Sequence, residues 1–279
     1  MKTVLAAFDN SPYSQSVGSY ACDFACCMNA KVAGYHVLDT AHVRALKQAF
    51  DAMPDSRDQQ VMQAREEGPE AMVERDITQS EGLFCAACTA SGAGFAIEHD
   101  TGAPERQIVH QAHTVDLVVL GRHGMHGSEA EYGLGHVASH VAAHSPKPVL
   151  VVPEQYARAM RPLVAFDGHA LSGHALALVA DLAESCCAIP HLITCAESEY
   201  TGGPILATGE KYLKRRGVEH TAELRIGGSE GLLLDAAREA KADLIAIGGT
   251  SHGPVMRWLG YHTLDRVLEY AECPVLVFR

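Results

Sequence analysis

One stretch of this chain occurs twice in the same order. Asp116–Pro153 reads DLVVLGRHGMHGSEAEYGLGHVASHVAAHSPKPVLVVP, and Asp243–Phe278 reads DLIAIGGTSHGPVMRWLGYHTLDRVLEYAECPVLVF. Each copy contains an apolar run ending in Gly, a Gly-rich loop, a helix-period segment closed by Pro, and a second apolar run. Continuous apolar runs of this length are typical of strands buried on both faces of a parallel sheet. The repeat therefore predicts two similar units in one chain.

The two units also begin alike. Thr3–Phe8 is an apolar run followed by Asp9, and Arg161–Phe166 is followed by Asp167. In both units strand-like and helix-period segments then alternate, with five strands expected in each. Such alternation favours a mainly parallel sheet with right-handed crossovers and helices on both faces. We predict an α/β fold made of two tandem doubly wound domains.

The domains are predicted at residues 1–155 and 160–279, and the short connection Glu154–Met160 cannot separate them widely. We therefore expect the two sheets to pack as an intramolecular pseudo-twofold pair through their edge strands. A further homodimer remains open.

The middle of each unit contains helix-breaking residues. The first unit carries a long insertion at about 39–92, which Pro54 and Gly68-Pro69 divide into helical segments. In the second unit, Gly202-Gly203-Pro204 predicts a break before a helix that runs to Arg216. The insertion is compatible with a lid, a cover for apolar surface or a docking element.

Charge and hydropathy exclude several classes of partner. Acidic residues outnumber basic ones 34 to 22, and the net charge of -12 disfavours binding to a nucleic-acid backbone. No apolar run approaches the roughly eighteen residues of a membrane helix, and Asp9 ends the first run too early for a secretory signal. The nine cysteines are an odd number and lie mostly in expected helices and strands. We expect a cytoplasmic protein with reduced thiols and neither a nucleic-acid nor a membrane partner.

The combined architecture resembles the universal stress protein family. In that family an early strand ends in Asp, and a later strand is followed by G-x-x-G, nine residues, G-[ST], a helix, Pro and a V-L-V-V strand. The resemblance covers nearly the whole chain apart from the insertion. It implies an adenine-nucleotide alpha-hydrolase-like fold and a non-enzymatic stress-response protein, at most a slow ATPase that depends on Asp9. Family members with the full motif bind ATP, with adenine and ribose near the Asp and phosphates on the Gly-rich loop.

The first copy of the loop departs from the family pattern at two points. Gly121-Arg122-His123-Gly124 is intact, but ten residues precede Gly135, and His136 stands where Ser or Thr is expected. His136 either donates to an anion or caps the helix, and Asp9 either contacts a ligand or forms an Asx-turn. The resemblance implies a site for ATP or a related adenine nucleotide in the first unit, formed by Asp9, Gly121, Gly124, Gly135 and His136.

The second copy departs further. Counting from Gly248 places Ser251 and Tyr261 where the family has Gly, and His262 where it has a hydroxyl. The family comparison therefore predicts a degenerate site in the second unit.

Histidines and cysteines suggest a different chemistry. His136, His140 and His144 repeat at i, i+4 and i+8, with His126 nearby, and helical His pairs of this spacing can bind zinc. The alternative is an exposed polar stripe. Cys85 and Cys88 have the spacing of a redox or metal pair, or they are small buried side chains in a helix.

Two hypotheses for the function follow. The first is a tandem stress-response protein that binds an adenine nucleotide in its first unit. The second is a tandem stress protein that binds no nucleotide and acts as a metal- or redox-responsive interaction module.

Overall fold

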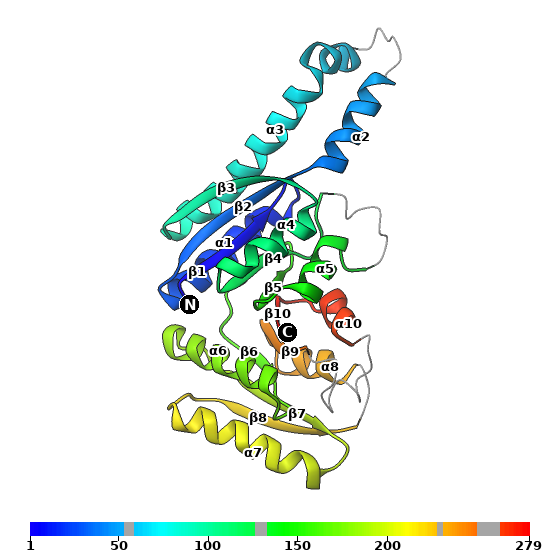
Figure 1. Cartoon of the computed structure of the whole chain (residues 1–279). Helices are drawn as coiled ribbons and strands as arrows, with labels where there is room; N and C mark the ends of the chain where they lie inside the picture. The colour runs from blue at the N-terminus through cyan, green and yellow to red at the C-terminus, as the bar shows by residue number, and fades with distance from the viewer. Residues whose placement is uncertain (53–58, 126–132, 228–230, 250–262) are drawn as a thin grey trace.

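A computed structural model describes residues 1–52, 59–125, 133–227, 231–249 and 263–279 of the chain. Ten strands form one sheet in the order β3-β2-β1-β4-β5-β10-β9-β6-β7-β8 (Figure 1). The strands of the first unit are β1 (Thr3–Phe8), β2 (Lys31–Asp39), β3 (Phe95–Gly102), β4 (Leu117–Gly121) and β5 (Val149–Val152). Those of the second unit are β6 (Pro162–Ala165), β7 (His191–Ala196), β8 (Thr221–Ile226), β9 (Leu244–Gly248) and β10 (Val275–Phe278).

Helices cover both faces of this sheet. Those of the first unit are α1 (Tyr13–Met28), α2 (Thr40–Asp51), α3 (Gln59–Ser91), α4 (Pro104–Gln111) and α5 (His136–His144), with a 3-10 turn at Ala112–Thr114. Those of the second unit are α6 (Ala170–Cys186), α7 (Glu199–Arg215), α8 (Leu232–Glu239) and α10 (Thr263–Tyr270). One apolar layer packs beneath α1, α3, α6 and α7, and the other beneath α4, α5, α8 and α10. The predicted α/β architecture is confirmed.

The two halves of the sheet meet at an antiparallel pair of edge strands. Pairing within each half is parallel, whereas β10 runs antiparallel to β5, with Leu276 opposite Leu150. Both residues are fully buried. An exposed edge strand offers unpaired N–H and C=O groups, and here each unit covers this edge of the other. The expected pseudo-twofold pairing through edge strands is therefore confirmed, as one continuous sheet.

Two arginines cross this junction in opposite directions. Arg122 follows β4 and donates to backbone carbonyls at the end of α10, including those of Glu269 and Cys273 at 3.5 Å each. Arg279 follows β10 and donates to the carbonyl of Ala143 near the end of α5. Carbonyls at a helix C-terminus lack intrahelical partners and carry the negative end of the helix dipole. Each unit thus caps a helix of the other.

A disulfide also joins the two units. α1 and α6 lie side by side on one face of the sheet, and Cys27 near the end of α1 is bonded to Cys186 at the end of α6 (Figure 1). The two Cα atoms are 6.1 Å apart, although 159 residues separate them in sequence. The prediction that all nine cysteines are reduced is wrong for this pair, because the sequence did not show that these helix ends converge.

This disulfide should stabilise the oxidised protein. Closing a loop of this length reduces the entropy of the unfolded chain, so we expect Cys186→Ser to lower the free energy of unfolding by about 2–5 kcal/mol. Urea unfolding without reductant measures the loss. Adding dithiothreitol should lower the free energy of unfolding of the wild type to that of the variant. Cys26→Ser, which removes the neighbouring exposed thiol, is the matched control. Equal stability of oxidised wild type and Cys186→Ser would contradict the prediction.

The insertion of the first unit forms a helical arm. α2 and α3 extend beyond the edge of the sheet (Figure 1), and α3 departs from helical geometry at Gly68, which has φ 77° and precedes Pro69. The predicted helices and the break at Gly68-Pro69 are therefore confirmed, while Pro54 lies outside the described residues. The base of α3 packs on the sheet through Phe84, which is fully buried and stacks on Phe8 with ring centroids 4.5 Å apart.

The packing of Phe84 depends on a glycine in β2. A Cβ atom at Gly34 would lie 2.5 Å from Cε1 of Phe84, so Gly34→Ala should displace α3 and destabilise the fold by about 1–3 kcal/mol. Gly82 of α3 has no atom within 4 Å of its Cβ position, so Gly82→Ala should stabilise by about 0.5–1 kcal/mol. Thermal unfolding of both variants tests the contrast. A Gly34→Ala protein as stable as Gly82→Ala would refute this account of the arm.

One predicted break is wrong. α7 runs without interruption through Gly202-Gly203-Pro204. Ser198 caps its N-terminus by accepting a hydrogen bond from the Thr201 N–H at 3.3 Å. A Cβ at Gly202 would lie 2.4 Å from Leu224, so this glycine permits close packing of the helix on the sheet. Tertiary packing has overridden the local propensity of these residues.

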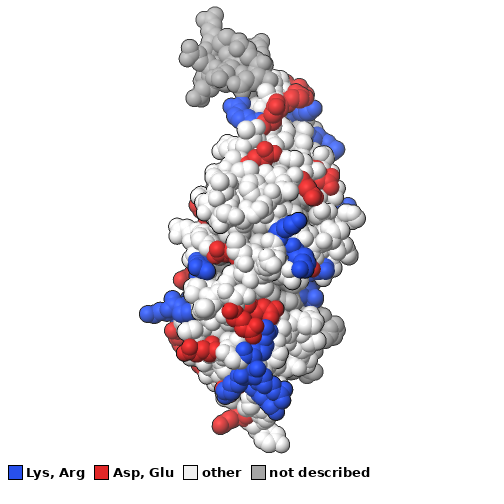
Figure 2. Space-filling model, turned by 90° about the vertical axis from the view of Figure 1, so that its left-hand side faces the viewer, with Lys and Arg blue, Asp and Glu red and all other residues white. Residues whose placement is uncertain are grey.

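The surface carries charges of both signs. On the face shown in Figure 2, basic side chains form small groups beside acidic ones. Arg216 illustrates such pairing, since its guanidinium lies 2.7 Å from Asp181 and 2.6 Å from Glu184. Within the described ranges, none of the helices combines the length and the apolarity needed to cross a membrane.

Candidate functional site

Asp9 lies at the carboxyl edge of the sheet, directly after β1, where open α/β folds bind ligands. Its Oδ1 accepts a hydrogen bond from the Ser11 N–H at 3.0 Å, which forms an Asx-turn. Its Oδ2 accepts a second bond from the Met125 N–H at 2.8 Å. The carboxylate therefore connects the start of the chain to the Gly-rich loop.

The Gly-rich loop passes very close to its neighbours at three glycines. A Cβ atom added at Gly121 would lie 2.6 Å from Cβ of Tyr13. One added at Gly124 would lie 2.8 Å from Oδ2 of Asp9, and one added at Gly135 would lie 2.9 Å from the Arg122 carbonyl oxygen. Real Cβ atoms do not approach other atoms this closely, so each position requires glycine. These glycines let the loop pack tightly against Asp9 and the start of α1.

The helix that follows the loop begins without a side-chain cap among the described residues. Gly135 is the N-cap of α5 and provides no side-chain acceptor, and the first turn of the helix contains no acidic residue. The first N–H groups of a helix have no intrahelical partner, and the helix dipole makes them attractive to anions. The start of α5 could therefore contact one anionic group of a ligand.

These elements enclose a cavity of about 420 Å³, within the range of small-molecule sites. All five residues predicted to hold a nucleotide line it: Asp9, Gly121, Gly124, Gly135 and His136. Sequence reasoning missed the wall that consists of His42, Val73, Asp76 and Ile77 of the arm, together with Asp39 at the end of β2. One signal was available for Asp39, which ends β2 at the same edge of the sheet as Asp9.

The cavity wall contains buried polar atoms without hydrogen-bond partners among the described residues. They are Oδ1 of Asn10, Oγ of Ser11, Nδ1 of His36 and Nδ1 of His123. Ser11 is only 3% exposed and His36 only 7%. Leaving one such group unpaired costs about 1–3 kcal/mol, and the four residues that carry these atoms all line the cavity.

Comparison with known proteins agrees with this architecture. The family model "Universal stress protein family" matches residues 1–153 and again residues 160–279. The chain belongs to the universal stress protein family. Each of its two units is one domain of that family.

Individual relatives support the same assignment. Universal stress protein Slr1230 of Synechocystis is 28% identical over 166 residues, which span 59% of this chain and 58% of that protein. The crystal structure of a universal stress protein from Archaeoglobus fulgidus has a TM-score of 0.75 at 18% identity and covers 99% of this chain and 98% of that one. A putative universal stress protein from Pseudomonas aeruginosa has a TM-score of 0.61 at 16% identity, with 100% and 93% covered. At these identities the two structures show the shared fold alone.

The second universal stress protein domain satisfies the matching positions internally. Thr194 corresponds to His36 by strand register, and its hydroxyl donates to the Phe166 carbonyl at 2.9 Å. Asp167 corresponds to Asp9, but it accepts from the Ser172 hydroxyl and the His169 N–H of its own turn. The loop positions Ser251, Tyr261 and His262 lie outside the described residues. The degenerate second site therefore remains a prediction.

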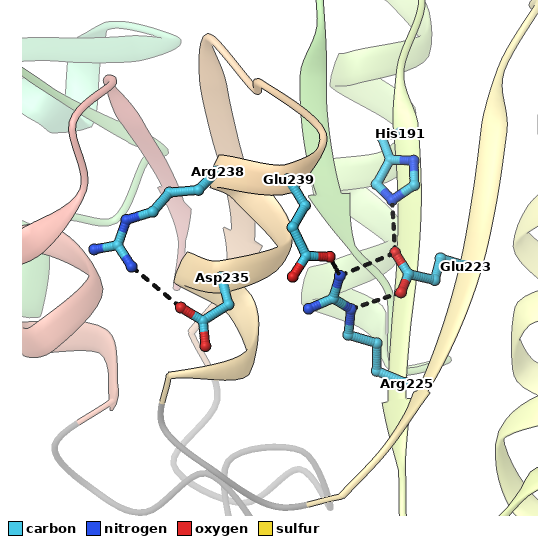
Figure 3. A network of polar contacts seen from close by, with 6 residues as sticks. All are labelled: His191, Glu223, Arg225, Asp235, Arg238 and Glu239. Atoms are coloured by element: carbon cyan, nitrogen blue, oxygen red, sulfur yellow. Dashed lines mark hydrogen bonds and ion pairs between the residues drawn. The ribbon is translucent and has the colours of Figure 1, made fainter.

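The outer edge of the second domain carries a charged network (Figure 3). The guanidinium of Arg225 contacts Glu223 at 2.6 Å and also binds Glu239, while Nε2 of His191 lies 3.3 Å from Glu223. By register, Arg225 of β8 corresponds to Asp100 of β3. The charged side chains of this edge are paired with one another, which indicates a structural role.

The described part of the histidine stripe shows no metal centre. Among the described residues, no three His, Cys, Asp or Glu side chains are placed to hold a metal ion. The rings of His140 and His144 stack with centroids 4.2 Å apart, and Nδ1 of His144 bonds to the His140 carbonyl at 2.8 Å. Stacked rings present their faces to each other, so their nitrogen atoms do not converge on a common point. The zinc site predicted at His136, His140 and His144 is thus not supported, and His126 lies outside the described residues.

The pair Cys85 and Cys88 is divided between two environments. Cys88 is buried against α1, where its hydrogen bond to Cys22 lowers the pKa of the Cys22 thiol, while Cys85 is half-buried. This arrangement agrees with the interpretation of the pair as small side chains packed in a helix.

The buried imidazole of His36 should make stability depend on pH. Burial, and then the neighbouring His99, lowers the pKa of His36 below its ordinary value near 6.5. As the pH falls through that value, the unfolded chain takes up a proton that the folded protein does not bind, so stability is lost on the acid side. We expect His36→Leu to lose less stability than the wild type between pH 7 and about pH 5.5. Urea unfolding at both pH values measures this loss of stability, and His110→Leu, at an exposed position, is the control. Equal losses of stability in the wild type and both variants would contradict the prediction.

Proposed function

We propose that the first domain binds an adenine nucleotide in the cavity beside Asp9, and that the protein is a non-enzymatic stress-response module. The observation that carries this proposal is the cavity beside Asp9, which is lined by all five residues that the family motif predicts for the nucleotide. The close-packed glycines of the loop and the uncapped start of α5 agree with it. Some members of the family bind adenine nucleotides.

Asp9 argues against rapid hydrolysis as the main activity. Its two oxygens each accept a backbone N–H, so the carboxylate is held as a structural acceptor. A slow ATPase would have to release phosphate in a reaction that Asp9→Asn abolishes.

Calorimetric titration of the full chain with adenosine, AMP and ATP tests the proposal. Gly124→Asp should abolish binding of every ligand that the wild type binds, because its side chain would meet Asp9. Gly203→Asp, on an open position of α7, should bind as the wild type does. If the wild type binds none of the three compounds, the proposal is wrong.

One observation favours the alternative hypothesis that the protein binds no nucleotide and is a redox-responsive interaction module. The Cys27–Cys186 disulfide joins the two domains, and disulfides are rare in cytosolic proteins unless they respond to redox state. If the wild type binds no nucleotide, comparing partner binding by oxidised and reduced protein becomes the decisive measurement.

A further inference from the structure

The charge of the cavity restricts which nucleotide it can accept. Three carboxylates line the described wall, one each from the β1 turn, the end of β2 and α3: Asp9, Asp39 and Asp76. The same described wall contains four histidines and no Lys or Arg. Such a wall is unfavourable for a polyphosphate, since like charges repel strongly where water is partly excluded.

The one arginine near the Gly-rich loop is directed elsewhere. Arg122 is turned away from the cavity and donates to carbonyls at the end of α10 in the second domain. The loop residues between Met125 and Gly133 lie outside the described part; their sequence contains Glu129 and Glu131 and no Lys or Arg. The loop sequence thus adds no permanent cation.

Two of the four histidines are also poor sources of positive charge. Burial lowers the pKa of both His36 and His123, with His99 and Arg122 as the respective second causes. Both imidazoles are therefore neutral at physiological pH. They can donate or accept a hydrogen bond, but they do not offset phosphate charge.

The carboxylates are held by neutral donors at the cavity wall. Asp76 accepts from Nδ2 of Asn10 at 3.1 Å, and Asp39 accepts from the Ala41 N–H at 2.8 Å. Asp9 accepts from the Met125 N–H, which removes one donor of the Gly-rich loop that a phosphate would otherwise use. What remains for an anion is the start of α5, whose partial positive charge of about half a unit suits a single phosphate.

We infer that the cavity accepts adenosine or its monophosphate and rejects the triphosphate, with Asp76 of the arm as a specificity-determining residue. This inference rests on the proposed function, because it concerns the same cavity. It assigns the arm a role in ligand selection, since α3 brings the acidic side chain of Asp76 to the cavity wall beside Asn10.

The titration that tests this is run on the full chain with AMP and ATP in the presence of EDTA, so that no divalent cation masks phosphate charge. The wild type should bind AMP at least about tenfold more tightly than ATP. Asp76→Asn keeps the shape and the acceptor for Asn10 while removing the charge, so it should reduce this preference by about threefold or more. Added salt should also reduce the preference, because it screens the repulsion.

Asp51→Asn is the matched control. Asp51 is exposed at the far end of α2, about 14 Å along the helix from the cavity residue His42. It changes the net charge as Asp76→Asn does, and it should leave the ratio of the two affinities unchanged.

The outcomes separate the two proposals. If ATP binds as tightly as AMP or more tightly, the inference is overturned while nucleotide binding stands. If Asp51→Asn alters the ratio as much as Asp76→Asn, net charge and not the cavity wall sets the preference, which also overturns it. If neither adenosine, AMP nor ATP binds, the proposed function fails and this inference fails with it.

Discussion

The antiparallel pairing of β5 with β10 is the interaction on which the rest of this structure depends. It joins two parallel sheets at the edges that would otherwise expose unpaired backbone groups, with Leu150 opposite Leu276 at its centre. Because the pairing is antiparallel, it relates the two domains by a pseudo-twofold axis. That relation places α1 beside α6, where the disulfide forms, and directs Arg122 and Arg279 to helix ends of the opposite domain.

The junction and the candidate site are physically connected through the Gly-rich loop. Arg122 lies between Gly121 and His123, both of which line the cavity, yet its guanidinium neutralises the carbonyl end of α10. A cation used to hold two domains together cannot also stabilise a phosphate. The way the domains are joined therefore contributes to the acidic character of the cavity.

Sequence patterns predicted what depends on local periodicity. The apolar runs before Gly121 and Gly248 gave the strands, and the glycine spacing located the loop that lines the cavity. Contacts between distant segments were not predictable in this way. The pairing of Cys27 with Cys186, the position of Asp76 beside Asn10, and the uninterrupted α7 at Gly202 all depend on which surfaces meet in the folded chain.

The two domains differ in how they pair the buried polar groups at the carboxyl edge of the sheet. At the carboxyl edge of β6 the hydroxyl of Thr194 and the carboxylate of Asp167 find partners within their own turn or neighbouring strand. At the carboxyl edge of β1 the imidazole of His36 and the hydroxyl of Ser11 are buried without a partner among the described residues. Unpaired buried groups of this kind each cost about 1–3 kcal/mol. Among the described residues this cost falls on the first domain, and the second domain contacts the first through α10, β10 and the disulfide.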